Sequence, residues 1–150
     1  MLKMKGSVPR FALCDSGFWI ALLDPRDAHH QDASAIYTQL ELWHALLPWP
    51  ALYEVASTRL SRDHRKLERL NRELRSHGLH KLQDEPYREA ALEKTLNPAS
   101  PRKALSLVDA VLREMIIDVN VKMHAFVTFN ARDFRDVCQR RGIEVISAPT

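Results

Sequence analysis

The feature that most constrains the fold is a short apolar run that stops at an aspartate. The apolar run Phe11–Cys14 leads into Asp15–Gly17, and a second apolar run follows over 18–23. Four to eight apolar residues bounded by a turn signal are typical of a buried parallel strand. The Asp-Ser-Gly segment supplies side chains that cap a following helix. An aspartate at the carboxyl end of such a strand also lies where open α/β sheets bind their ligands.

The rest of the chain alternates between strand and helix patterns. Strands are expected at about 11–14, 45–47, 79–82, 125–129 and 143–146. Helices are expected at about 16–23, 27–43, 50–60, 59–77, 86–97 and 105–123, with a short one inside 130–142. This alternation predicts a parallel sheet with crossover helices. We expect residues 1–10 to be a flexible tail and residues 11–150 to form one domain, because 150 residues are enough for a single core.

Charge and cysteine content indicate which partners and which cellular location to expect. The net charge is +3 and the sequence pI is about 9.0, which permits a polyanionic partner without requiring one. Cys14 and Cys138 match no metal-ligand spacing, and Cys14 lies in a predicted core strand. Reduced thiols and a cytoplasmic location are therefore expected. No segment reaches the roughly 18 uninterrupted apolar residues of a membrane span, so no membrane association is expected.

Two further carboxylates are candidates to meet Asp15. Glu54 is expected in the first turn of a helix entered directly from the second strand, where the helix dipole alone would favour an acid. Asp109 shares the spacing of the apolar stripe of the long helix at 105–123. A carboxylate on that stripe is costly unless it is paired or bound to a cation. Arg113, one turn later, is the alternative partner for Asp109.

The fourth strand is followed by a further polar group. Thr128 and Asn130 leave the carboxyl end of this strand, and Asp133 lies one turn into the next helix. Taken singly, Asn130 or Asp133 would be interpreted as a helix cap. Together with Asp15, Glu54 and Asp109, however, these residues can converge on one edge of the sheet. Clustered carboxylates repel one another, and a hard cation such as Mg²⁺ or Mn²⁺ relieves that repulsion. The absence of paired Cys and of well-spaced His argues against zinc.

The ordered set of these short motifs resembles the PIN domain family, and within it the small prokaryotic VapC-type toxins. The blocks, in chain order, are Asp15-Ser16 before an Ala-Leu-Leu helix, Glu54 in Ala-Leu-Tyr-Glu, Asp109 in Ser-Leu-Val-Asp-Ala, and Thr128-Phe-Asn-Ala-Arg-Asp-Phe134. The resemblance spans about residues 11–147. It implies an α/β fold with a five-stranded parallel sheet in the order 3-2-1-4-5, sandwiched by helices. It also implies a metal-dependent endoribonuclease.

The resemblance further implies which residues carry the chemistry. Asp15, Glu54, Asp109 and Asp133 are expected to be catalytic and to hold Mg²⁺ or Mn²⁺ directly or through water. The hydroxyls of Ser16 and Thr128 are expected to orient carboxylates through hydrogen bonds, with Asn130 assisting. Asn130 is a departure, because many family members have Asp there. Other VapC-like proteins have Asn at this place and an acid three residues later, which Asp133 matches.

The basic stretch from Arg59 to Lys81, which includes an amphipathic helical part at 59–77, is the candidate contact for RNA. Lys and Arg bind phosphates without reading sequence. The predicted RNA-binding residues are Arg59, Arg62, Arg65, Lys66 and Arg69. The alternative is a solvated helix face. The helices around this stretch could equally form a homodimer surface or receive an antitoxin, and a homodimer is expected.

Three functional hypotheses follow. The first is an active PIN ribonuclease that is the toxin of a toxin–antitoxin pair. The second is a catalytically weakened PIN-like module that binds RNA or a protein, for which Asn130 is the support. The third, a phospho-acceptor receiver domain, requires a lysine after a late strand, whereas Lys122 is expected inside the long helix. A P-loop or Rossmann enzyme is disfavoured because the chain has no Gly-rich phosphate loop.

Overall fold

A five-stranded parallel sheet forms the centre of the protein. The computed structural model describes residues 8–99 and 104–150. The strands are β1 (Phe11–Cys14), β2 (His44–Pro48), β3 (Leu79–Leu82), β4 (Ala125–Val127) and β5 (Glu144–Ile146). Their spatial order is β3-β2-β1-β4-β5, and every neighbouring pair is parallel. The predicted fold class, strand positions and strand order are therefore confirmed.

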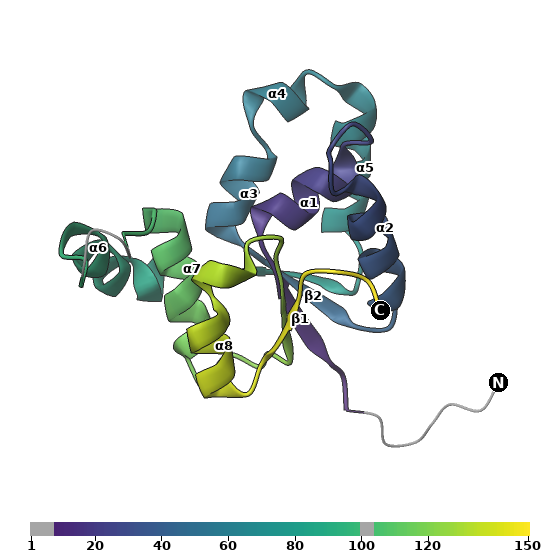
Figure 1. Ribbon diagram of the computed structural model, residues 1–150. Helices are drawn as coiled ribbons and strands as arrows, with labels where there is room; N and C mark the ends of the chain where they lie inside the picture. Colours follow the sequence, from purple (N-terminus) through teal and green to yellow (C-terminus); the bar gives the residue numbers. More distant parts are fainter. Residues whose placement is uncertain (1–7, 100–103) are drawn as a thin grey trace.

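Helices cover both faces of this sheet (Figure 1). One side carries α1 (Ser16–Leu23), α2 (His30–Gln39), α3 (Trp49–Val55), α4 (Thr58–Ser61) and α5 (His64–Leu74). The other side carries α6 (Arg88–Leu96), α7 (Leu107–Ile117) and α8 (Arg135–Arg141). Two short 3₁₀ turns, η1 (Glu85–Tyr87) and η3 (Ala131–Asp133), precede α6 and α8.

The central strands β1 and β4 are apolar throughout because helices cover both faces of the sheet there. Side chains alternate between the two faces of a strand. In β1, Ala12 and Cys14 therefore join the core under α1, α2 and α3, whereas Leu13 joins the core under α7 and α8. Phe126 in β4 likewise packs with Leu13, and all of these side chains are almost completely buried. Near-continuous apolar strands are expected where helices cover both faces of a parallel sheet.

The predicted helix boundaries are partly wrong on the α1–α5 side. The helix expected at 27–43 is shorter, because Asp27 holds a turn: its Oδ1 accepts from the His29 N–H at 2.8 Å, and α2 begins at His30. The helix expected at 50–60 ends as α3 at Val55. The basic stretch is not one helix either. Asp63 interrupts it and caps α5 by accepting hydrogen bonds from two backbone N–H groups.

The long helix predicted at 105–123 is also shorter. Ser106 is the N-cap of α7 and Asp118 its C-cap, so α7 covers only Leu107–Ile117. Lys122 lies beyond the helix, just before β4, and not within the helix as expected. It still does not follow a late strand, so the requirement of a receiver domain is not met.

The structure describes the carboxyl-terminal end of the chain but only part of the expected amino-terminal tail. Most of the expected tail, residues 1–7, lies outside the described residues, and residues 8–10 lead into β1. Gly142 ends α8 in the left-handed conformation, with φ of 66°, where glycine is favoured. In the two described ranges, no helix combines the length and the apolar character that crossing a membrane requires.

Candidate functional site

Asp15 lies at the carboxyl end of β1 and caps α1. Its Oδ1 accepts a hydrogen bond from the Phe18 N–H at 3.1 Å, and its Oδ2 accepts one from the Thr128 hydroxyl at 2.5 Å. The residue is 8% exposed. The capping role is thus real, but each carboxylate oxygen has a second lone pair. Capping therefore leaves Asp15 able to bind a further ligand.

The segment after β4 carries Thr128, Asn130 and Asp133, of which Thr128 contacts Asp15 directly. Thr128 is completely buried, and its Oγ1 accepts a hydrogen bond from the Asn130 N–H at 3.0 Å. The Asn130 side-chain amide donates to Asp133 Oδ2 at 2.6 Å. Asn130 therefore holds Asp133, the acid three residues later. Ser16 starts α1 and is half-buried, and its hydroxyl bonds to none of the residues that the structure describes.

Glu54 was predicted in the first turn of its helix, but it is the residue before the last one of α3. The reason is that α3 already begins at Trp49 and ends at Val55. The carboxyl end of a helix is its negative pole, so the helix dipole disfavours a carboxylate there. A favourable interaction with the helix dipole, which was the alternative explanation for Glu54, is therefore absent. Its side chain is exposed and close enough to Asp15 for the two charges to interact.

Asp109 is the third residue of α7, whereas the helix predicted at 105–123 would make it the fifth. Ser106 Oγ accepts a hydrogen bond from the Asp109 N–H at 3.1 Å, and the two side chains also interact. Ser106 therefore caps the amino terminus of α7 through the backbone N–H of Asp109. Arg113 does not pair with Asp109, which was the alternative interpretation of the sequence. It pairs with Asp136, both N–O distances being 2.7 Å, and donates to the backbone carbonyl of Asp133 at 2.8 Å.

The four candidate carboxylates are connected electrostatically. Burial raises the pKa of Asp15, the hydrogen bonds from Thr128 and from the Phe18 N–H lower it, and the charges of Asp109 and Glu54 raise it again. Burial also raises the pKa of Asp109, the Ser106 hydroxyl lowers it, and the charge of Asp133 raises it. Each of the four carboxylates is therefore repelled by the charge of at least one other. This excess of negative charge at one edge of the sheet is what a cation would neutralise.

The donor atoms at this edge fit a hard divalent cation. Asp15, Glu54, Asp109 and Asp133 offer carboxylate oxygens, which Mg²⁺ and Mn²⁺ prefer. The four carboxylates do not form a compact cluster. Within residues 8–99 and 104–150, no three His, Cys, Asp or Glu side chains are close enough to hold a metal ion by themselves. Mg²⁺ keeps several waters when bound, so contacts through water suit this spacing.

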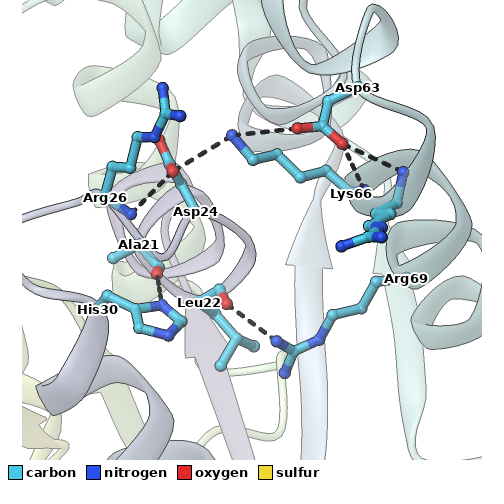
Figure 2. Close-up of polar contacts among 9 residues, drawn as sticks. Ala21, Leu22, Asp24, Arg26, His30, Asp63, Lys66 and Arg69 are labelled. Carbon is cyan, nitrogen blue, oxygen red and sulfur yellow. Dashed lines mark hydrogen bonds and ion pairs between the residues drawn. The ribbon is translucent and has the colours of Figure 1, made fainter.

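Two of the five predicted RNA-binding residues instead hold α5 against the end of α1 (Figure 2). Lys66 Nζ lies 3.2 Å from Asp24 Oδ1, the C-cap of α1, and 3.7 Å from Asp63 Oδ2. Arg69 donates to the backbone carbonyl of Leu22 at 3.1 Å. Both side chains are half-buried. The predicted residues that remain available are Arg59, Arg62 and Arg65, which are exposed and form no ion pair with the described part of the chain.

Ser106 was missed in the sequence. Ser-Leu-Val-Asp is the spacing of a capping box, which would have started α7 at Leu107 and placed Asp109 in its first turn. The pairing of Arg113 with Asp136 has no comparable local signal. These residues are 23 positions apart and meet only because α7 packs on α8.

The strand order and the helices on both faces of the sheet match a PIN-like fold. The solved structures similar to this chain include the VapC20 toxin of Mycobacterium tuberculosis, which is described as cleaving the sarcin-ricin loop. The TM-score is 0.66 at 19% sequence identity, over 83% of this chain and 93% of that one. The chain therefore has the fold of a VapC-type PIN domain. No protein-family model matches the sequence, and a search of curated proteins finds no significant match.

Proposed function

We propose that this protein is a divalent-metal-dependent endoribonuclease and the toxin of a toxin–antitoxin pair. The observation that carries the proposal is the mutual influence of Asp15, Glu54, Asp109 and Asp133 at the carboxyl edge of a VapC-type fold. The partners in this proposal are an RNA substrate, a cognate antitoxin and a second copy in a homodimer, and the location is the cytoplasm.

The four acids would hold Mg²⁺ or Mn²⁺, directly or through water. When bound, such an ion lowers the pKa of a water and stabilises negative charge on the phosphoryl group. The protein's own residues keep the acids in place. Thr128 and the Phe18 N–H fix the rotamer of Asp15, Asn130 fixes that of Asp133, and Ser106 holds the turn that carries Asp109.

The phosphodiester backbone of the substrate must approach a strongly negative edge, so cations elsewhere have to hold it. Arg59, Arg62 and Arg65 are the exposed basic residues of the stretch that leads from α3 into α5. Their contacts would be with phosphates and would position RNA without reading its sequence. Lys66 and Arg69 take no direct part in this binding, since both are engaged at the end of α1.

The decisive experiment is cleavage of purified RNA with Mg²⁺ or Mn²⁺, beside a sample containing a chelator. Substrates should include total RNA and a hairpin with the sarcin-ricin loop, the target named for VapC20. Asp15→Asn and Asp109→Asn should abolish cleavage, and Asp32→Asn, an exposed acid on α2, should not. Full activity of both site variants would refute the proposed site.

A second candidate is a catalytically weakened PIN-like module that binds RNA or a protein partner. Asn130 favours it, because an amide that donates to Asp133 adds no negative charge to the site. Metal-independent RNA binding without cleavage would favour this module. A neighbouring reading frame for a small DNA-binding protein would favour the toxin.

A further inference from the structure

The amino-terminal edge of the sheet carries a row of aromatic rings that the proposed function does not use. The rings come from three adjacent strands and from the residue before β4. In spatial order they are His80, His44, Phe11 and His124, with centroids separated by 5.1, 5.0 and 6.3 Å. Asp15 follows the opposite end of β1, so this row and the acidic site lie at opposite edges of the sheet.

Two of these rings meet through their nitrogens. His44 Nδ1 lies 2.9 Å from His80 Nε2, although the residues are 36 positions apart. Pairing of β2 with β3 fixes the two backbones, and Phe11 stacks on the His44 ring with an interplanar angle of 26°. His44 is half-buried and His80 is exposed, so solvent reaches the pair. The two nitrogens are thus held together by the fold and remain accessible.

We propose that His44 and His80 form a binding site for a transition-metal ion that takes ligands at right angles, such as Ni²⁺ or Cu²⁺. Imidazole nitrogens bind such ions at roughly 2.0–2.1 Å, which places two ligands at a right angle about 2.9 Å apart. A separation of 2.9 Å between His44 Nδ1 and His80 Nε2 is therefore that of adjacent ligands on one ion. Water fills the other positions, since the pair supplies two ligands.

The same distance also suits an N–H···N hydrogen bond between neutral rings. Metal binding therefore requires that the other nitrogen of each ring be free to carry the proton. His44 Nε2 and His80 Nδ1 have no hydrogen-bond partner among the residues described. Each ring can therefore move its proton to that outer nitrogen and turn a lone pair toward the ion, as metal binding requires. His124 is different, because its Nδ1 accepts a hydrogen bond from the Phe11 N–H at 3.0 Å.

Metal binding at this pair would connect the edge strand β3 to β2. Only the folded chain brings the two imidazoles together, so the ion stabilises the folded state by mass action. Ligand chemistry separates this site from the acidic one. Nitrogen ligands select Ni²⁺ and Cu²⁺, whereas carboxylates select Mg²⁺ and Mn²⁺. The proposal therefore does not depend on nuclease activity.

The test is calorimetric titration of the untagged protein with Ni²⁺ in excess Mg²⁺, together with thermal unfolding. The wild type should bind one Ni²⁺ and its Tm should rise. His44→Ala and His80→Ala should each lose this binding and the Tm shift. His77→Ala is the matched control: His77 is exposed, just before β3, and the variant should bind Ni²⁺ like the wild type.

Two results would overturn the site. One is a wild type that neither binds Ni²⁺ nor gains thermal stability, which would leave the pair as a hydrogen bond. The other is retention of wild-type affinity by both histidine variants, which would place the ion elsewhere. If His44→Ala unfolds, His80→Gln decides the question, because His80 is exposed on an edge strand. Asp15→Asn should bind Ni²⁺ unchanged.

Discussion

The Thr128 hydroxyl donates to Asp15 Oδ2 at 2.5 Å and joins the end of β4 to the start of α1 across 113 positions of sequence. The same Oγ1 accepts from the Asn130 N–H, so its own proton is free to point to Asp15. One buried hydroxyl therefore sets the orientation of the central acid and of the turn that carries Asn130 and Asp133.

Replacing Thr128 with Val should destabilise the protein by about 1–3 kcal/mol, because it leaves the buried Asp15 oxygen and the Asn130 N–H without their partner. Urea unfolding at pH 7 measures the loss. Thr128→Ser keeps the hydroxyl and is the matched control. Equal stability of the Val and Ser variants would show that the hydroxyl bond contributes nothing.

Substitutions of Asp15 should separate its capping role from its chemical role. Asp15→Ala removes the cap of α1 and should cost about 1 kcal/mol, while Asn caps nearly as well as Asp. Both variants should lose RNA cleavage. Unfolding curves and cleavage assays on the same preparations test this. An Asp15→Asn variant that cleaves RNA normally would contradict the proposed role of the carboxylate.

The sheet could be predicted from sequence because its signals are local. The strands β1, β2 and β4 are short, mainly apolar runs with turn residues near their ends, and a parallel sheet buried on both faces requires such runs. The edge strands β3 and β5 have exposed polar residues and give a weaker signal. Asp15 was recognisable for the same reason, as a polar residue directly after β1. The strand order came from the resemblance, because apolar runs alone do not specify which strands are neighbours.

Helix ends and side-chain partners were less predictable. Asp63 and Ser106 are caps inside stretches whose apolar spacing continues past them, so periodicity alone extends the helices too far. Partners depend on packing between distant segments. Lys66 and Arg69 look like RNA-binding residues in sequence, yet the docking of α5 on α1 directs them to Asp24 and to the Leu22 carbonyl.

Some residues of the basic stretch should therefore affect RNA binding and others the stability of the fold. Arg62→Ala should weaken RNA binding without changing stability, and removing its one phosphate interaction should lower the salt-dependence slope by about 0.7 for single-stranded RNA. Arg69→Ala should instead destabilise the fold by about 1 kcal/mol, because its bond to the Leu22 carbonyl is absent. Binding titrations at several salt concentrations, with unfolding curves, distinguish the two. A salt slope unchanged in Arg62→Ala would remove that residue from the interface.

The acidic edge should make stability fall as pH rises. Burial raises the pKa of Asp109 in the folded protein above its unfolded value, which is about 3.9. Between the two values the folded state binds more protons than the unfolded state, so stability decreases with pH across this window and stays lower above it. Asp109→Asn carries no charge at any pH. It should be more stable than the wild type at pH 7, and the difference should shrink toward pH 3.

Urea unfolding of both proteins from pH 3 to pH 8 measures this difference. Subtracting one curve from the other cancels acids that titrate alike in both, including Asp136, whose pKa the hydrogen bond from Arg113 lowers to about 2. Asp32→Asn, at an exposed position on α2, controls for the general effect of removing one negative charge. A gain in stability that is independent of pH, or equal in the two variants, would show that Asp109 is not destabilised by burial and by its acidic neighbour.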